Sequence, residues 1–277
     1  MKKIPYFKVN DLKGKFVLIE GINGSGKTTQ AKLLESALAA KGIKAKWNHE
    51  PTDGLMGKII RQIIEGGKIE VAEEELERFL EGALGDEKVL KEVSKSFVEQ
   101  FKKRVALEIR KAEEKRQHLF VIDRLFDLKE NILPALKNGS WVIQDRYDIS
   151  CYLHGMANDV AFNFLTKKHE MILKENYLAP NLIIFYWLPI NIALKRLQKS
   201  QKVIDCYEKI QTLKKVEKEA RWLFSFKRKK PTAEYPLIRK FKIKDKLAKV
   251  IIINAEPSID EVFKMTWEYI EKYLLEE

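Results

Sequence analysis

The sequence predicts an α/β fold in which a parallel sheet is wrapped by helices. Strand-like apolar runs alternate with amphipathic helical runs along the chain, a pattern that favours βαβ units. A glycine-rich loop at the end of the first long apolar run is typical of the phosphate-binding turn in such folds. The expected strands cover residues 16–20, 44–49, 119–122, 141–144, 182–187 and 250–254.

The clearest chemical signal is FVLIEGINGSGKTTQ at residues 16–30, where an apolar strand enters a G-x-x-x-x-G-K-T loop. The glycines free the backbone to turn its N–H groups toward phosphate oxygens, the lysine can reach the β and γ phosphates, and the threonine hydroxyl can hold Mg²⁺. Apolar residues then recur at helical spacing until Gly42. The sequence therefore predicts a nucleoside triphosphate site. Its expected residues are Gly21, Ile22, Asn23, Gly24, Ser25, Gly26, Lys27, Thr28 and Thr29.

The composition is that of a globular chain of 277 residues, with 45% hydrophobic and 10% aromatic residues. The first residues lack the apolar core of a signal peptide, and the longest apolar run, residues 182–190, is too short to span a bilayer. Cys151 and Cys206 stand apart, as expected of packing residues in a reducing compartment. We therefore expect a cytoplasmic protein that does not use a membrane.

The net charge of +12 fits anionic substrates and nucleic acid alike. Most of the charge alternates with glutamate along amphipathic stretches, which is typical of solvated helix faces. Two stretches look like insertions: a long, charged, helical one at about 69–117 and a basic, aromatic-rich one at about 221–246. The second could bind nucleic acid or form a packed subdomain beside a phosphate site. The packed subdomain is favoured, and nucleic acid is not the expected partner.

Two Asp-Arg pairs each follow an apolar run that is a predicted strand. They are Asp123-Arg124 and Asp145-Arg146. Because ligands of open parallel sheets bind beyond the carboxyl ends of the strands, both pairs point to the same crevice as the glycine loop. An arginine there can hold phosphate bidentately while the aspartate reaches a Mg²⁺-bound water. A structural ion pair at a strand end is the alternative. The polar turn EPTDG, residues 50–54, follows the second predicted strand.

Taken in order, these segments resemble the thymidylate kinase family of P-loop nucleoside monophosphate kinases. The matching pieces are FVLIEGINGSGKTTQ, EPTDGLMGKIIRQII, LFVIDR, GSWVIQDRYDIS, APNLIIFYWLPINIALKRL and DCYE. EPTDG, F-x-x-D-R and DRY-x-x-S together are much more specific than the loop alone. The resemblance implies a single domain over residues 1–277. It would be a P-loop three-layer sandwich with a parallel five-stranded sheet flanked by helices, plus the insertions at about 69–117 and 221–246.

The resemblance also implies transfer of the γ-phosphoryl group of MgATP to the 5′-phosphate of dTMP, with ATP and Mg²⁺ as cofactors. The implied catalytic residues are Lys27, Arg124 and Arg146, and the implied metal ligands are Thr28 and Asp145. Phe120 would cover the thymine face, and Ser150 would either meet the base or sugar or simply cap a helix. The implied substrate-binding residues are Glu50, Phe120, Arg124, Arg146, Ser150 and Tyr152.

Several positions depart from the family pattern. Asn23 replaces a loop carboxylate, His49 replaces an arginine before the Glu-Pro pair, and Tyr152 stands near the usual aromatic position. The segment after ALKRL usually supplies a catalytic arginine, but here it offers Lys199 and Lys202, which lack the bidentate fork. The expected substitutes from the second insertion are Arg221, Arg228 and Lys229.

Two classes of function follow. The first is an active dTMP kinase, or a close variant that phosphorylates another deoxynucleotide or a nucleoside. The second is a catalytically weak P-loop protein that binds nucleotide and acts in regulation or on nucleic acid through its insertions. The expected partners are the small nucleotides dTMP and ATP, and the resemblance allows a homodimer.

Overall fold

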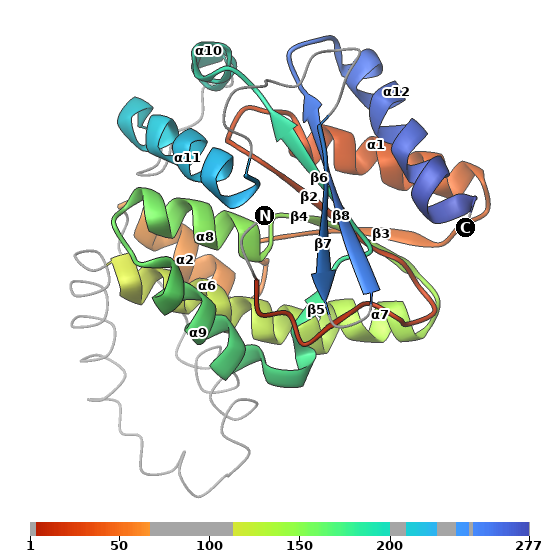
Figure 1. Cartoon of the computed structure of the whole chain (residues 1–277), viewed down its shortest axis with the longest axis horizontal. Coiled ribbons are helices and arrows are strands. Elements are labelled where there is room, and N and C mark those ends of the chain that lie inside the picture. The colour runs from red at the N-terminus through yellow and green to blue at the C-terminus, as the bar shows by residue number, and fades with distance from the viewer. Residues whose placement is uncertain (1–3, 67–112, 200–208, 226–236, 244–245, 277) are drawn as a thin grey trace, which may run out of the picture.

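A six-stranded sheet forms the centre of the molecule (Figure 1). The computed structural model describes residues 4–66, 113–199, 209–225, 237–243 and 246–276. The strand order is β3-β4-β2-β6-β8-β7, and all neighbours are parallel except β7 and β8. The strands are β2 (Phe16–Gly21), β3 (Ala45–His49), β4 (Trp141–Asp145), β6 (Leu182–Trp187), β7 (Leu237–Ile243) and β8 (Lys246–Asn254). A separate parallel pair joins β1 (Lys8–Val9) to β5 (Leu178–Ala179).

The central strands are apolar runs because helices cover both of their faces. Every residue of β2, β4 and β6 is buried, as parallel strands inside an α/β protein require. The register sets Gly21 opposite Tyr186 and Ile19 opposite Asp145. The carboxyl ends of β2, β4 and β6 therefore meet at one edge of the sheet, where the glycine loop begins.

In the described part of the chain, helices cover both faces of the sheet (Figure 1). The first face carries α1 (Lys27–Ala40) and α12 (Ile259–Ile270). The second carries α2 (Leu55–Ile64), α6 (Glu113–Asp127), α7 (Leu133–Lys137), α8 (Asp148–Ala157) and α9 (Phe162–Leu173). After β6 come α10 (Ile190–Lys199) and α11 (Ile210–Leu223), which packs on α8. Short π-helical turns cover Leu128–Ile132 and Glu271–Leu275, and a 3-10 turn covers Lys174–Asn176.

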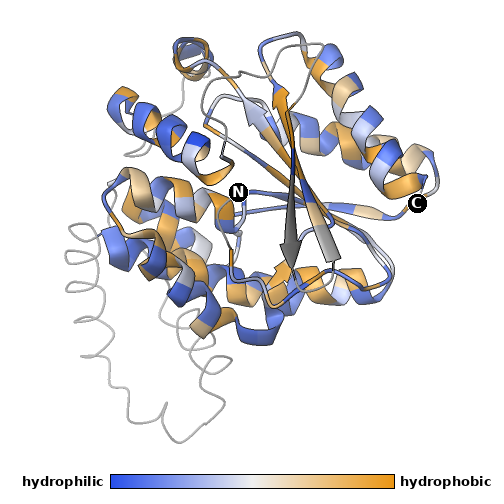
Figure 2. Cartoon of the chain, in the orientation of Figure 1, coloured by the Kyte–Doolittle hydropathy of each residue, from blue (hydrophilic) through white to orange (hydrophobic). Residues whose placement is uncertain are grey.

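The helices carry hydrophobic and hydrophilic residues side by side, as expected when one side of each packs on a core (Figure 2). In α12, for example, Val262, Thr266 and Ile270 are buried, and Ser258 closes a capping box with Glu261 at the start of the helix. The predicted three-layer α/β fold with five parallel strands is confirmed, and β7 extends it by one antiparallel edge strand.

One predicted strand was wrong. Residues 119–122 lie inside helix α6, so Asp123 and Arg124 belong to that helix and do not follow a strand. A four-residue apolar run cannot by itself distinguish a strand from a buried helix segment. The charged stretch EEKRQH that precedes it belongs to the same helix, and the run packs there beside α8 and α9.

The two predicted insertions have different outcomes. Residues 67–112 lie outside the described structure, and residues 113–117 form the N-terminal part of α6. The second stretch is no separate subdomain where it is described: residues 221–223 end α11, and residues 237–243 form β7 on the edge of the main sheet. The Trp222 ring packs edge-on against Phe162, with centroids 5.3 Å apart.

Within the described ranges, no helix is both long and apolar enough to cross a membrane.

Asp127 ties α6 to the sheet. The Asn48 amide of β3 donates to both of its carboxylate oxygens, at 2.8 and 2.9 Å, and Asn131 donates at 3.0 Å. Asp127 is only 1% exposed. Burial raises the pKa of its carboxyl to about 6, although the amide donors oppose this shift.

Asp127→Asn is expected to change how stability depends on pH. Between the unfolded pKa of about 3.9 and the folded pKa of about 6, the folded chain holds a proton that the unfolded chain has released. The wild type should therefore lose stability relative to Asp127→Asn as the pH rises from about 4 to about 6. The expected change is roughly 2 to 3 kcal/mol in the free energy of unfolding, measured by urea titration. The exposed Asp159→Asn is the control, and a pH-independent difference for Asp127→Asn would contradict the expectation.

Candidate active site

The glycine loop joins β2 to α1 in a conformation that needs its glycines. Gly21 has φ 147° and Gly24 has φ 81°, values that side chains rarely allow. A Cβ on Gly21 would lie 2.6 Å from the Tyr186 carbonyl oxygen, and one on Gly24 would lie 2.9 Å from that of Ala193. Lys27 begins α1 and donates from Nζ to the Ile22 carbonyl at 3.0 Å, so its ammonium group lies against the loop.

Thr28 and Asp145 meet at the carboxyl edge of the sheet. The Thr28 hydroxyl donates to Asp145 Oδ2 at 2.5 Å. The other carboxylate oxygen, Asp145 Oδ1, is buried and accepts no hydrogen bond from the described residues. Hydroxyl and carboxylate oxygens are the ligands that Mg²⁺ prefers, and Mg²⁺ usually takes only one or two of them from the protein. The pair therefore fits the expected metal site, which opens into a crevice of about 570 Å³ lined by the loop.

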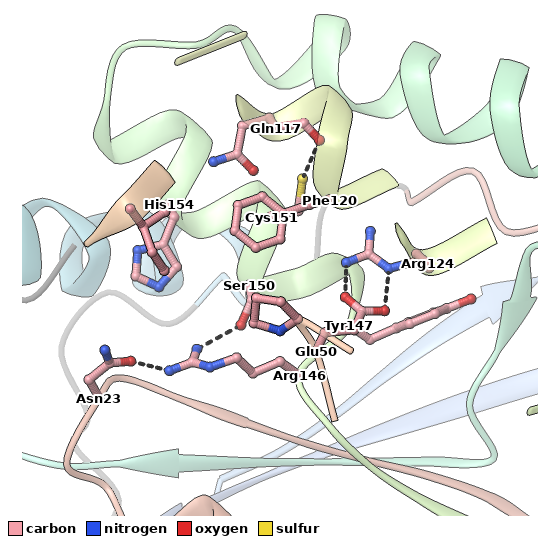
Figure 3. A pocket seen from close by; sticks show the side chains of 12 residues that line it. Asn23, Glu50, Gln117, Phe120, Arg124, Arg146, Tyr147, Ser150, Cys151 and His154 are labelled. Carbon is pink, nitrogen blue, oxygen red and sulfur yellow. Dashed lines mark hydrogen bonds and ion pairs between the residues drawn. The ribbon is translucent and has the colours of Figure 1, made fainter. Parts of the chain in front are cut away.

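Arg146 links the glycine loop to the start of α8. Its backbone has φ 73°, a left-handed conformation that is uncommon for a non-glycine residue. Its guanidinium donates to Ser150 Oγ at 2.9 Å and makes a close hydrogen bond to Asn23 Oδ1. The Arg146 side chain is therefore held between the phosphate crevice and the wall of a second cavity (Figure 3).

Glu20 of β2 holds the start of α8 and Ser150 in place. It was not among the predicted site residues. Its carboxylate accepts from the backbone N–H groups of Tyr147 and Ser150 at 2.9 and 3.0 Å, and from Ser150 Oγ at 2.7 Å. It thus serves as the cap of α8, although it belongs to β2. Burial raises the pKa of the Glu20 carboxyl, and Arg146 opposes this shift. A lone carboxylate in the apolar run FVLIEG was the signal that could have identified it.

The second cavity has a volume of about 100 Å³ and lies between α6, α8 and the EPTDG turn. Several predicted substrate-binding residues line it, and the lining residues that were not predicted include Gln117, Cys151 and His154. Burial raises the pKa of the Cys151 thiol to about 12, which fits the predicted packing role. Burial, together with Arg146 and Lys27, lowers the pKa of His154 to about 3, so its imidazole is neutral. The predicted residues that line the cavity are Asn23, Glu50, Phe120, Arg124, Arg146 and Ser150.

Tyr152 does not face this cavity. It is fully buried behind α8, and its hydroxyl shares a hydrogen bond of 2.8 Å with that of Tyr177. In a helix, residues four apart lie on the same side. His154 lies four residues after Ser150, so it and not Tyr152 continues the cavity wall along α8.

Arg124 is completely buried and already holds a carboxylate. Its Nε donates to Glu50 Oε1 at 2.9 Å, its Nη2 pairs with Glu50 Oε2, and its Nη1 lies 2.6 Å from His169 Nε2. Burial alone would lower the pKa of Arg124, but the Glu50 carboxylate outweighs it and raises that pKa. The arrangement does not support the expected grip of Arg124 on an acceptor phosphate.

Asp123, the neighbour of Arg124, serves the EPTDG turn. Its carboxylate accepts from the backbone N–H of Thr52 at 2.9 Å and from the Thr52 hydroxyl at 2.6 Å. His49 turns toward the same turn, with Nδ1 2.9 Å from the Pro51 carbonyl oxygen. Asp123 therefore shapes the cavity wall and does not approach the expected metal site.

The residues expected to replace the catalytic arginine of the lid are only partly within the described structure. Lys199 ends α10, while Lys202, Arg228 and Lys229 lie outside the described residues. Arg196 lines the phosphate crevice and donates to the Glu256 carbonyl at 3.3 Å. Arg221 stacks over the Trp187 ring at 4.5 Å and pairs with Glu217. Among the described basic residues just named, Arg196 alone lines that crevice.

Comparisons with known proteins agree with this geometry. The family model for thymidylate kinase matches residues 19–93 and 87–234. A probable thymidylate kinase of Pyrococcus horikoshii is 31% identical over 193 residues, which is 68% of this chain and 71% of the relative. A thymidylate kinase of Leptospira interrogans is 30% identical over 202 residues, 73% and 77% of the two chains. A probable thymidylate kinase of Thermococcus gammatolerans is 26% identical over 263 residues, 95% and 98%.

Glu50→Gln is expected to destabilise the chain by about 3 to 5 kcal/mol, because it leaves the Arg124 charge buried without a counterion. The double variant Glu50→Gln/Arg124→Met removes that charge and should recover part of the loss. Urea unfolding measures both. Glu217→Gln breaks the more exposed pair with Arg221 and should cost about 0 to 1 kcal/mol. Equal losses for Glu50→Gln and Glu217→Gln would show that the buried pair carries no special weight.

Proposed function

The chain belongs to the thymidylate kinase family, and from this premise we propose that it transfers the γ-phosphoryl group of MgATP to dTMP, giving dTDP and ADP. It is an ATP-dependent nucleoside monophosphate kinase. The observation that carries the proposal is the position of Arg146, which contacts Asn23 of the glycine loop and Ser150 of the second cavity. One arginine thus stands between a site for a triphosphate and a site for an acceptor nucleotide.

On the donor side, the backbone amides of the glycine loop and the Lys27 ammonium group bind the β and γ phosphates of ATP. The ammonium group donates to the Ile22 carbonyl, 3.0 Å away, and would exchange this contact for a phosphate oxygen when ATP binds. Thr28 and Asp145 would hold Mg²⁺, which when bound neutralises phosphate charge and fixes the geometry of the triphosphate.

On the acceptor side, the nucleophile is a phosphate oxygen of dTMP, which is already ionised near neutral pH. The reaction therefore needs no strong general base, and positioning and charge neutralisation provide most of the catalysis. Arg146 supplies both: its guanidinium is fixed by Ser150 and Asn23, and its charge lies where two anionic groups must approach each other.

The base would lie in the cavity between α6 and α8, with Phe120 against its face. Arg124 and Glu50 act there as a buried pair that shapes the wall. Use of Mg²⁺, a cytoplasmic location and a homodimer remain predictions. No contact among the described residues favours a nucleic-acid role.

Lys27→Ala is expected to lower acceptor-dependent turnover by at least about a hundredfold, because it removes a charge at the transferred phosphate. The test is coupled ADP release with MgATP and dTMP, dUMP, dCMP, dGMP, dAMP, UMP or thymidine. The matched control is Lys167→Ala, an exposed lysine of α9. ATP consumption that ignores every acceptor would refute the proposed function.

Asp145→Asn is expected to raise the Mg²⁺ concentration needed for half-maximal activity by roughly tenfold, because a carboxylate near the metal becomes a neutral amide. Titration of activity with Mg²⁺ at saturating nucleotide measures the shift. Asp159→Asn changes an exposed aspartate by the same group and should leave the titration unmoved. If both variants titrate like the wild type, Asp145 does not serve the metal.

A further inference from the structure

We propose that Gln117 determines the base selectivity of the acceptor cavity, and that its amide oxygen accepts a hydrogen bond from the N3–H of a thymine or uracil ring. The inference rests on the proposed function and adds a specificity-determining residue to it. Gln117 lines the cavity, is only 2% exposed, and comes from α6, one turn before Phe120.

The cavity has a phosphate end and a base end. Asn23 and Arg146 lie along one side of it, next to the glycine loop, while Gln117 lies at the opposite side (Figure 3). The Phe120 ring and His154 lie between these two ends. A nucleotide whose phosphate meets Arg146 and whose base lies against Phe120 therefore extends the edge of its base toward Gln117.

Neighbouring helix residues hold Gln117 in place. The Cys151 thiol of α8 lies 3.9 Å from the Gln117 carbonyl oxygen. One turn further, a Cβ on Gly155 would lie 2.8 Å from Leu165 Cδ1 and 3.4 Å from Gln117 Cγ, so Gly155 makes room for Leu165 while α8 stays close to the Gln117 side chain. The packing of α6 on α8 thus fixes the side chain at the cavity wall.

A hydrogen bond to Glu113 fixes the orientation of the Gln117 amide group. The Gln117 amide nitrogen donates to Glu113 Oε1 at 2.5 Å. The other oxygen, Oε2, accepts from Arg116 Nε at 2.9 Å, and this pair holds the carboxylate in position. The carboxylate oxygen is the acceptor in this contact, so the amide nitrogen faces Glu113. The opposite atom of the amide group, the acceptor Oε1, is then the one turned toward the cavity (Figure 3).

This orientation distinguishes the pyrimidines. Thymine and uracil carry a donor at N3, whereas cytosine carries an acceptor there, so an oxygen at this position attracts the first two bases and repels the third. A freely rotating amide would match either pattern, and Glu113 removes that freedom. The nearby Arg124 does not provide the same selection, since three of its nitrogens already contact Glu50 and His169.

The test compares Gln117→Leu and Glu113→Lys with the wild type. Gln117→Leu removes the acceptor at similar volume. Glu113→Lys places a donor beside the amide, so the amide should turn and present its nitrogen to the cavity. Glu114→Lys makes the same charge change on the exposed neighbour in the same helical turn and is the control. The measurements are calorimetric binding of dTMP, dUMP and dCMP, kcat/KM for each, KM for ATP, and the melting temperature.

Gln117→Leu should weaken the binding of dTMP and of dUMP by about tenfold each, the usual effect of losing one buried hydrogen bond. The affinity for dCMP and the KM for ATP should stay unchanged. Glu113→Lys should reduce the ratio of dTMP affinity to dCMP affinity by at least about tenfold, because dCMP should bind more tightly. Glu114→Lys should behave like the wild type. An unchanged ratio of dTMP to dCMP binding in both folded variants would overturn the inference, as would a wild type that binds dCMP as well as dTMP.

The two proposals fail in different ways. If the wild type turns over dTMP but the Gln117 and Glu113 variants keep its selectivity, the kinase stands and the assignment of Gln117 falls. If the wild type turns over no acceptor, the proposed function falls, and the calorimetric ratios still decide whether Gln117 selects the base. A variant that loses affinity for every nucleotide, ATP included, or melts far below the wild type reports a folding defect, and the other variant then decides.

Discussion

The site depends on one buried carboxylate, Glu20. It ends the apolar part of β2, directly before the first glycine of the loop, and it accepts hydrogen bonds from the first turn of α8. A helix N-terminus attracts negative charge, so the contact satisfies both partners. Through Ser150 it also orients Arg146. The distance between the triphosphate loop and the acceptor cavity is therefore set by a group that lines neither the phosphate crevice nor the cavity.

A second group of buried charges shapes the acceptor cavity. Arg124 lies between Glu50 of the EPTDG turn, His169 of α9 and the ring of Tyr147, whose centroid is 4.9 Å away. The His169 Nδ1 lies 2.8 Å from the Leu165 carbonyl oxygen, an acceptor, so the proton resides on Nδ1 and Nε2 accepts from the arginine. Such a network costs desolvation, but it fixes the wall because each member has only one satisfactory orientation.

The sequence predicted the parts whose signals are local. Glycine spacing identified the phosphate loop, and strand-like runs identified five of the strands. The clearest of these, β2 and β6, are apolar because a strand buried on both faces has little freedom in composition. It failed where a residue's role depends on distant partners. Residues 119–122 satisfy a strand pattern as well as a helix pattern, and only packing against α8 and α9 decides between them. Gln117 and His154 could be assigned to the cavity only once α6 and α8 were brought together, and the lone carboxylate of FVLIEG showed Glu20 to be unusual but not which groups it binds.

Asn23 illustrates how one departure from the family pattern fits the chemistry. Its amide oxygen accepts from Arg146, so it keeps the contact that orients the guanidinium. A carboxylate at this position would form an ion pair and neutralise part of the arginine's charge before any ligand arrives. The neutral amide leaves that charge to the phosphates. Both substrates are anionic, and the described lid residues offer no further arginine contact to the acceptor cavity. An Arg146 charge that no loop carboxylate neutralises is therefore the stronger arrangement for bringing the phosphates together.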